Sequence, residues 1–216
     1  MSAQRQDVSM NNFERNVFIN CPFDSSYRPL LMVLVFTVVY LGYKPRLSFE
    51  RSDSAEARID KIVGLINDSK FGIHDLSRMV SKGENEHMRM NMPFELGIDY
   101  GCKKLKGGMW SDKQLLVLDK ERYRFHRSLS DLSGSDIKHH DDDEIKLMKA
   151  VREWFVGTEK LKSIPSHKVI WNIFNDFQAF LHDKLVEQEG HDSVDDVQEV
   201  EVIDHMIEWM SELSNA

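Results

Sequence analysis

The first half of the chain alternates between short apolar segments and longer segments with helical character. The short segments have the composition and length of buried strands and cover residues 16–20, 44–50, 71–75 and 114–119. The expected helices between and after them cover residues 29–41, 54–67 and 93–104. In the second of these, the apolar residues at helical spacing are Ile59, Ile62, Val63 and Ile66. Because strands alternate with helices, the pattern predicts an α/β domain with a doubly wound, mainly parallel sheet of four to five strands.

Helices dominate the second half of the chain. After a polar and irregular stretch, the expected helices cover residues 144–156, 166–188 and 193–213. The last two are amphipathic, so we expect them to pack as a hairpin against the domain or against a second copy of the chain. The pattern therefore predicts a polar N-terminal arm (1–15), an α/β domain (16–160) and a helical C-terminal hairpin (161–216).

Neither a membrane span nor a secretory signal is indicated. The longest apolar run, residues 30–41, has about half of the ~20 residues that a membrane helix needs, so it is expected to be a buried core helix. Residues 1–16 are polar and lack the apolar core of a signal peptide. The two cysteines, Cys21 and Cys102, lie far apart and predict neither a disulfide framework nor a zinc site. A cytoplasmic protein without a membrane contact is expected.

Charge is distributed unevenly along the chain. The net charge is −8, and the segment from residue 185 to the end contains ten acidic residues and no Lys or Arg. The rest of the chain is therefore close to neutral. Neither part has the dense basic face that binding to a phosphate backbone requires, so no nucleic-acid partner is expected. Binding of a single nucleotide stays open.

One carboxylate lies where a helix is expected to begin. In residues 89–97 (RMNMPFELG), Pro93 is expected to open the helix, which places Glu95 in its first turn. There the helix dipole favours the ionised carboxylate, which can act as a nucleophile or stabilise a developing cation. Both roles suit cleavage of an N-glycosidic bond. Glu95 could also be only a favourable first-turn charge.

Polar and aromatic side chains follow the predicted strands. In a parallel sheet the loops after the strands meet at one edge, where doubly wound folds bind their ligands. The candidate ligand-binding residues in these loops are Asn20, Pro22, Phe23, Asp24, Glu50, Asp75, Ser77 and Arg78. Two alternatives stay open: Asp24 and Asp75 could cap turns or helices, and Asn20 could satisfy the backbone of a loop.

Two families resemble parts of this chain. Residues 91–104 (NMPFELGIDYGCKK) are similar to the Gly-Thr-x-x-Glu-Leu-Gly-x-Ala segment of nucleoside 2-deoxyribosyltransferases, whose glutamate attacks the anomeric carbon. The resemblance gives that role to Glu95. The strand at 71–75 resembles the family's preceding strand, whose final aspartate contacts the ligand, and this implies a catalytic-site role for Asp75. Residues 16–24 (NVFINCPFD) resemble the opening strand and loop of TIR domains, whose enzymatic members cleave NAD with a glutamate.

The resemblance covers about residues 16–120 and implies a flavodoxin-like or TIR-like sheet. It also implies an enzyme that acts on the N-glycosyl bond of NAD or another nucleotide as its substrate, without a cofactor. The transferases have an acidic residue before their Gly-Thr pair, whereas this chain has Arg89 and Asn91 there. A cationic Arg89 suits a phosphate, so we expect a nucleotide ligand with Arg89 and Asn91 among its binding residues.

A set of four motifs, INCPFD, HDLSR, NMPFELG and SDLSGSDI, is similar to bacterial TIR-like proteins associated with defence. This resemblance implies an antiphage effector. It also implies that the chain works as a homo-oligomer or with a partner effector protein, through its C-terminal helices. The alternatives are a nucleotide sensor without catalysis that regulates a partner, and a scaffold whose acidic tail recruits one.

The segment 130–140 (SDLSGSDIKHH) contains four residues of metal-binding type: Asp131, Asp136, His139 and His140. Adjacent histidines rarely bind one ion, and a metal site needs several ligands with supporting geometry, so no metal is expected. We expect this segment to be a loop that folds over the cleft or caps the next helix.

Overall fold

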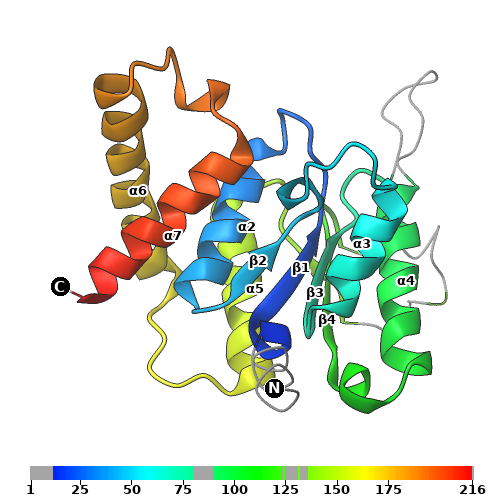
Figure 1. Cartoon of the computed structure of the whole chain (residues 1–216). Helices are drawn as coiled ribbons and strands as arrows, with labels where there is room; N and C mark the ends of the chain where they lie inside the picture. Colours follow the sequence, from blue (N-terminus) through cyan, green and yellow to red (C-terminus); the bar gives the residue numbers. More distant parts are fainter. Residues whose placement is uncertain (1–11, 80–89, 123, 125–130, 132–135, 216) are drawn as a thin grey trace, which may run out of the picture.

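The computed structural model describes residues 12–79, 90–122, 124, 131 and 136–215, and this part of the chain forms one parallel sheet covered by helices (Figure 1). The strands are β1 (Asn16–Asn20), β2 (Lys44–Arg46), β3 (Phe71–Asp75), β4 (Gln114–Asp119) and β5 (Lys138–His139). They lie in the order β2-β1-β3-β4-β5, and every neighbouring pair is parallel. This is the strand order of flavodoxin-like sheets, so the predicted fold class is confirmed.

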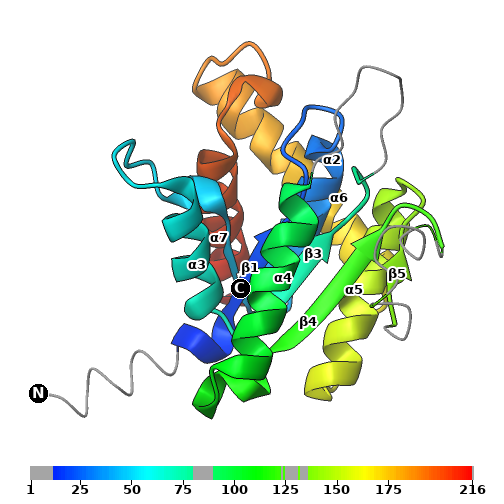
Figure 2. The same cartoon turned by 90° about the vertical axis from the view of Figure 1, so that its right-hand side faces the viewer.

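Helices cover both faces of the sheet, as a doubly wound fold requires (Figure 2). One face carries α2 (Arg28–Tyr40) and α5 (Glu144–Glu159), and the other carries α3 (Arg58–Asn67) and α4 (Asn91–Leu105). In α2 every residue from 30 to 38 is buried, which confirms that this apolar run is a core helix. None of the helices described is long and apolar enough to cross a membrane.

The C-terminal helices pack against α2. They comprise α6 (His167–His182), the π-helical turn η5 (Asp183–Gln188), the short η6 (Val194–Asp196) and α7 (Glu199–Asn215). Phe174 and Phe177 of α6 contact Phe36 of α2, with ring centroids 5.0 and 5.8 Å away, and Trp209 of α7 lies 5.5 Å from Phe177. The expected hairpin therefore shares one hydrophobic core with the sheet. The division at residue 160 stays a prediction.

Two predicted elements are shorter than the sequence indicated. The second strand was expected at 44–50, but β2 ends at Arg46 and the chain turns into η1 (Ser48–Glu50). The Glu50 carboxylate accepts a hydrogen bond from the backbone N–H of Leu47, 3.3 Å away, and pairs with Arg46 at 2.6 Å, which favours the turn over a longer strand. Likewise, α3 begins at Arg58 rather than at residue 54.

One strand lies in a segment expected to be a loop. Lys138 and His139 pair with Leu118 and Asp119 of β4 and form the edge strand β5. An edge strand needs backbone pairing on one side only, so it does not require the apolar composition of the inner strands. The next helix is capped from outside the loop, because the Asp143 side chain accepts from the N–H of Lys146 at 2.8 Å.

Candidate functional site

The strand order reverses between β1 and β3: β2 lies on the outer side of β1, and β4 lies on the outer side of β3. Doubly wound sheets bind their ligands outside the carboxyl ends of the strands at such a switch point. Asn20 ends β1, Asp75 ends β3, and α4 with Glu95 is the next described helix after β3. Most of the predicted site residues therefore belong to this edge of the sheet.

Glu95 is the fifth residue of α4, because the helix begins at Asn91 and has no acidic residue in its first turn. The prediction that Pro93 opens the helix is therefore wrong. Pro93 is the third helical residue, and a proline is tolerated there because the first backbone N–H groups of a helix have no acceptor within it. The charge of Glu95 is consequently set by its surroundings and not by a place in the first turn.

The surroundings of Glu95 raise its pKa to about 7 from an ordinary 4.5. Burial is the main cause, since only 7% of the side chain is exposed. Arg58 opposes this effect: its Nη2 lies 3.8 Å from Oε1 of Glu95 and favours the ionised form. A carboxyl group with such a pKa exchanges its proton near neutral pH, as a catalytic acid or base must.

A cavity of about 470 Å³ lies beside Arg58, at the carboxyl ends of β1 and β2. Its lining residues are Phe23, Ser48, Phe49, Asp53, Ser54, Glu56, Arg58, Lys61 and Glu199. The volume is within the range of about 300–1,000 Å³ that small-molecule sites have. Phe23 and Phe49 form an aromatic wall, with ring centroids 5.5 Å apart and planes at 77°. Glu95 lies behind Arg58 rather than in the wall of this cavity.

A second cavity of about 310 Å³ shares Phe23 and Glu199 with the first. Asp24 and Arg28 also line it, and the Arg28 guanidinium pairs with Glu199 at 2.7 Å and with Asp195 at 3.3 Å. The beginning of α7 and the segment before it therefore close one side of the cleft. This contribution of the C-terminal helices was not predicted from the sequence.

Asn20 anchors the start of α4 and does not face the cavities. Its Nδ2 donates to the carbonyl oxygen of Met92 at 2.9 Å and to Nδ1 of His74 at 3.1 Å, and the residue is buried. The alternative that Asn20 satisfies the backbone of a neighbouring segment therefore describes its contacts. Asn20 thereby fixes the helix that carries Glu95.

A second set of buried contacts fixes α4 further along the helix, at Asp99. Since Nδ1 of His74 accepts from Asn20, its Nε2 carries the hydrogen and donates to Oδ2 of Asp99 at 3.1 Å. Lys113 Nζ lies 3.1 Å from Oδ1 of Asp99, and all three side chains are fully buried. Glu95 thus lies between two fixed points of α4, the Met92 carbonyl and the Asp99 carboxylate.

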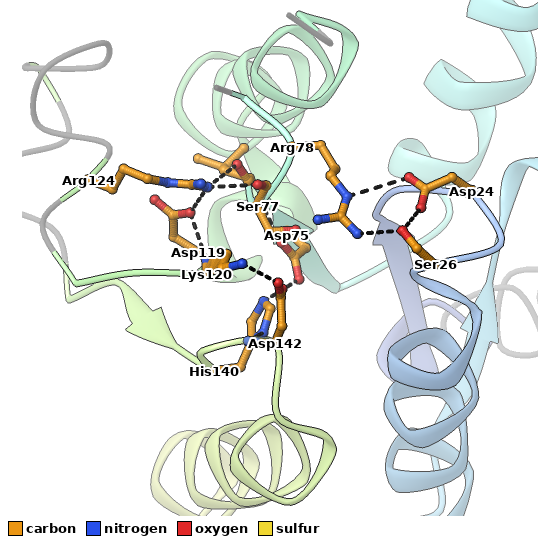
Figure 3. A network of polar contacts seen from close by, with 11 residues as sticks. Asp24, Ser26, Asp75, Ser77, Arg78, Asp119, Lys120, Arg124, His140 and Asp142 are labelled. Carbon is orange, nitrogen blue, oxygen red and sulfur yellow. Dashed lines mark hydrogen bonds and ion pairs between the residues drawn. The ribbon is translucent and has the colours of Figure 1, made fainter. Parts of the chain in front are cut away.

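Asp75 is fully buried and its oxygens are occupied (Figure 3). Oδ2 accepts from the Tyr27 hydroxyl at 2.5 Å, and Oδ1 accepts from the N–H of Ser77 at 2.8 Å. Nε2 of His140 lies 3.0 Å from Oδ2, although its N–H is not well aligned with that oxygen. Burial raises the pKa of Asp75, but His140, Tyr27 and Ser77 outweigh it and leave the pKa below its ordinary value. Asp75 is therefore ionised and forms a hub: it joins the segments that contain Tyr27, Ser77 and His140.

Two arginines hold the loops around this hub (Figure 3). Arg78 Nε lies 3.5 Å from Oδ2 of Asp24, and its Nη2 donates to Oγ of Ser26 at 2.9 Å. Arg124 Nη2 pairs with Asp119 and also donates to the backbone carbonyl oxygen of Ser77 at 2.8 Å. These contacts join the loops after β1, β3 and β4.

The remaining predicted residues have varied surroundings. Pro22 is buried, and Asn91 is exposed as the first residue of α4. Glu50 pairs with Arg46 outside the wall of the 470 Å³ cavity. Arg89 lies outside the described residues. Of the predicted binding residues, Phe23 and Asp24 thus line the cavities, and Asn20, Asp75, Ser77 and Arg78 belong to the networks behind them.

Sequence reasoning missed Arg58, which links Glu95 to the cavity. It also did not predict that Tyr27 and His140 contact Asp75. These residues are far from their partners along the chain, and their spacing carries no signal of the contact. Among the described residues, no group of three His, Cys, Asp or Glu side chains could hold a metal ion.

Comparisons of the chain with models of protein families, with curated proteins and with solved structures found no match. The resemblance to TIR domains and to deoxyribosyltransferases therefore stays a prediction based on short motifs. A function for this chain has to follow from the chemistry of the site itself.

Proposed function

We propose that this chain cleaves the N-glycosidic bond of NAD or another nucleotide, with Glu95 as the nucleophile or as the group that stabilises the cationic sugar. One observation carries the proposal: a buried carboxyl group with a pKa of about 7 lies beside a cation and a cavity of ligand-binding size, outside the carboxyl ends of the strands of a doubly wound sheet. The motif resemblance points to the same residue. Cleavage of NAD or nucleotides would also suit the antiphage role that the resemblance implies.

Arg58 has a specific part in this proposal. It stands between Glu95 and the cavity, and its side chain is 61% exposed, so it is free to turn towards a ligand. A guanidinium group binds phosphate oxygens in a bidentate manner. When a nucleotide phosphate draws Arg58 into the cavity, the Glu95 carboxyl becomes open to the sugar. The Phe23 and Phe49 rings offer a surface on which the base can stack.

The chemical step then needs the ionised form of Glu95. As the bond between C1′ and the base nitrogen breaks, its electron pair leaves with the base and positive charge develops on the sugar. The Glu95 carboxylate stabilises this charge or bonds to C1′, and water then adds its hydroxyl group to C1′ and frees the carboxylate. The proton of this water goes to the solvent when nicotinamide leaves NAD as a neutral base, and to the base when another nucleotide is cleaved. Asp75 does not touch the sugar in this scheme; it positions the loops after β1 and β3 through Tyr27 and Ser77.

Base release from NAD and from a panel of nucleotides, followed by chromatography, tests the proposal. Glu95→Gln should lower the rate by about 10²-fold or more, whereas Glu187→Gln, at an exposed position of η5, should keep the wild-type rate. The wild-type rate should rise with pH around a midpoint near 7, because the carboxylate is the active form. Absence of base release from every nucleotide, or full activity of Glu95→Gln, would reject catalysis by this residue.

The low exposure of Glu95 favours one alternative, a nucleotide sensor that regulates a partner. In that case Arg58 and the aromatic wall bind the nucleotide, and Glu95 only balances the charge of Arg58. Calorimetry would then show binding that Arg58→Gln abolishes, while chromatography recovers the nucleotide intact.

A further inference from the structure

The outer side of α4 is unusually apolar for a helix surface. Four large apolar side chains are exposed on the helix and the residue before it: Met90 (58%), Phe94 (60%), Tyr100 (48%) and Leu105 (87%). Successive helical residues turn by about 100°, which puts Met90, Phe94 and Leu105 opposite the buried side that carries Met92 and Leu96. Packing of α4 against the sheet therefore does not explain why these three residues are apolar.

The neighbouring helix α3 extends the same surface. Ile59 and Val63, one turn apart, are 40% and 45% exposed. One turn further along is Asn67, whose Oδ1 accepts a hydrogen bond from Lys106, just after α4, so this side of α3 faces α4. We define the α4 surface as Ile59, Val63, Met90, Phe94 and Leu105. Several large exposed apolar side chains on two neighbouring helices suit an interaction site.

Positive charge borders the α4 surface. Lys103 and Lys104 lie in the last turn of α4 and Lys106 follows it. Among the described residues, none of the three forms an ion pair with a carboxylate. They suit the negative end of the helix dipole, but this does not explain the 87% exposure of Leu105 between them. A partner for this surface should therefore be apolar in part and acidic at one end.

The same chain carries such a surface on α7. Four exposed carboxylates follow one side of that helix at intervals of three or four residues: Glu201, Asp204, Glu208 and Glu212. No ion pair joins them to a cation in the part of the chain that the structure describes. Ile207, beside them, is 41% exposed. We call these five residues the acidic stripe. An uncompensated row of carboxylates repels itself and favours a cationic partner.

The two surfaces lie on opposite sides of the molecule. Figures 1 and 2 show α7 beyond α2 on one face of the sheet, and α3 and α4 on the other face. The α4 surface therefore cannot contact the acidic stripe of its own chain. We propose that this chain assembles head to tail, with the α4 surface and its lysines docked on the acidic stripe of the next copy. Because the two surfaces differ, each copy can bind two neighbours, and the assembly grows unless it closes into a ring.

Sedimentation of the full chain over a range of concentrations tests the proposal. At low salt the average mass should rise above that of one chain as the concentration increases, and at high salt it should fall, because screening weakens the attraction between the charged groups. Lys104→Glu with Leu105→Glu should abolish the rise, and so should Glu201→Lys with Glu208→Lys. All four side chains are exposed, so the variants should fold. Val169→Glu, 45% exposed on α6, is the matched control and should assemble as the wild type does.

A mixture of the two double variants gives the sharpest result. The Lys104/Leu105 variant keeps a working acidic stripe, and the Glu201/Glu208 variant keeps a working α4 surface. Each alone should stay a single chain, and an equimolar mixture should form complexes, because the α4 surface of one variant can dock on the acidic stripe of the other. A wild type that remains a single chain at all concentrations, a Glu201/Glu208 variant that still assembles, or a mixture that stays dissociated would overturn the proposal. None of these results depends on whether Glu95 is catalytic.

Discussion

Replacing Glu95 by glutamine should remove a specific part of the pH dependence of folding. The pKa of Glu95 is raised in the folded chain to about 7 from 4.5, so the folded state holds this proton more tightly than the unfolded state does. The resulting stabilisation is fully present below pH 4.5 and is lost as the pH rises through 7. A difference between 4.5 and about 7 corresponds to about 3 kcal/mol. Glutamine has no proton to lose, so the variant should not show this loss.

Urea unfolding at a series of pH values measures the effect. The stability of Glu95→Gln relative to wild type should increase by about 2.5 kcal/mol from pH 5 to pH 8, since the other titrating groups are common to both proteins. Glu187→Gln, at an exposed position of η5, is the control and should stay within about 0.5 kcal/mol of wild type throughout. Titration of the ¹³C-labelled Glu95 carboxyl by NMR gives the midpoint directly.

A stability difference between Glu95→Gln and wild type that is the same at pH 5 and pH 8 would refute the reasoning. It would mean that the carboxyl of Glu95 is in contact with water in the folded chain. The proposed midpoint near 7 for base release would then lose its physical cause as well.

Two further changes test the surroundings of Glu95. Arg58→Gln removes the cation 3.8 Å from Glu95, so the pKa of Glu95 should rise above 7, as NMR titration will show; an unchanged or lower midpoint would mean that the ion pair does not form. Gly72→Ala places a Cβ atom against Oδ2 of Asp99, closer than two such atoms can approach, and should destabilise the chain by more than about 2 kcal/mol in urea unfolding. Gly157→Ala, in open space on α5, should instead stabilise it by about 0.5–1 kcal/mol; equal effects of the two changes would contradict the close contact at Gly72.

The fold followed from the sequence because its signals are local. β1 and β3 are buried along their whole length, and a strand covered by helices on both faces must be apolar throughout. The apolar run in α2 was recognisable for the same reason. The edge strand β5 was not predicted. It has only two residues and one neighbouring strand, so it needs no apolar pattern that the sequence could show.

The location of the candidate site also followed from the sequence. In a parallel sheet the carboxyl ends of all strands lie at one edge, so the loops after β1 and β3 had to meet there. Phe23 and Asp24 line cavities at that edge. The predicted start of α4, Pro93, is two residues later than the observed start at Asn91. A proline fits any of the first helical positions, so it does not mark the first one.

The roles of the site residues were decided by the tertiary structure alone. Burial and the approach of Arg58 set the charge of Glu95, and both depend on how α3 and α4 pack. Asn20 and Asp75 were expected to bind a ligand, yet each is occupied by partners distant in sequence, such as His74 and Tyr27. The sequence determined which residues reach the edge of the sheet. Only packing determined which of them keep a free side chain, because hydrogen bonds and desolvation depend on distances that no local pattern contains.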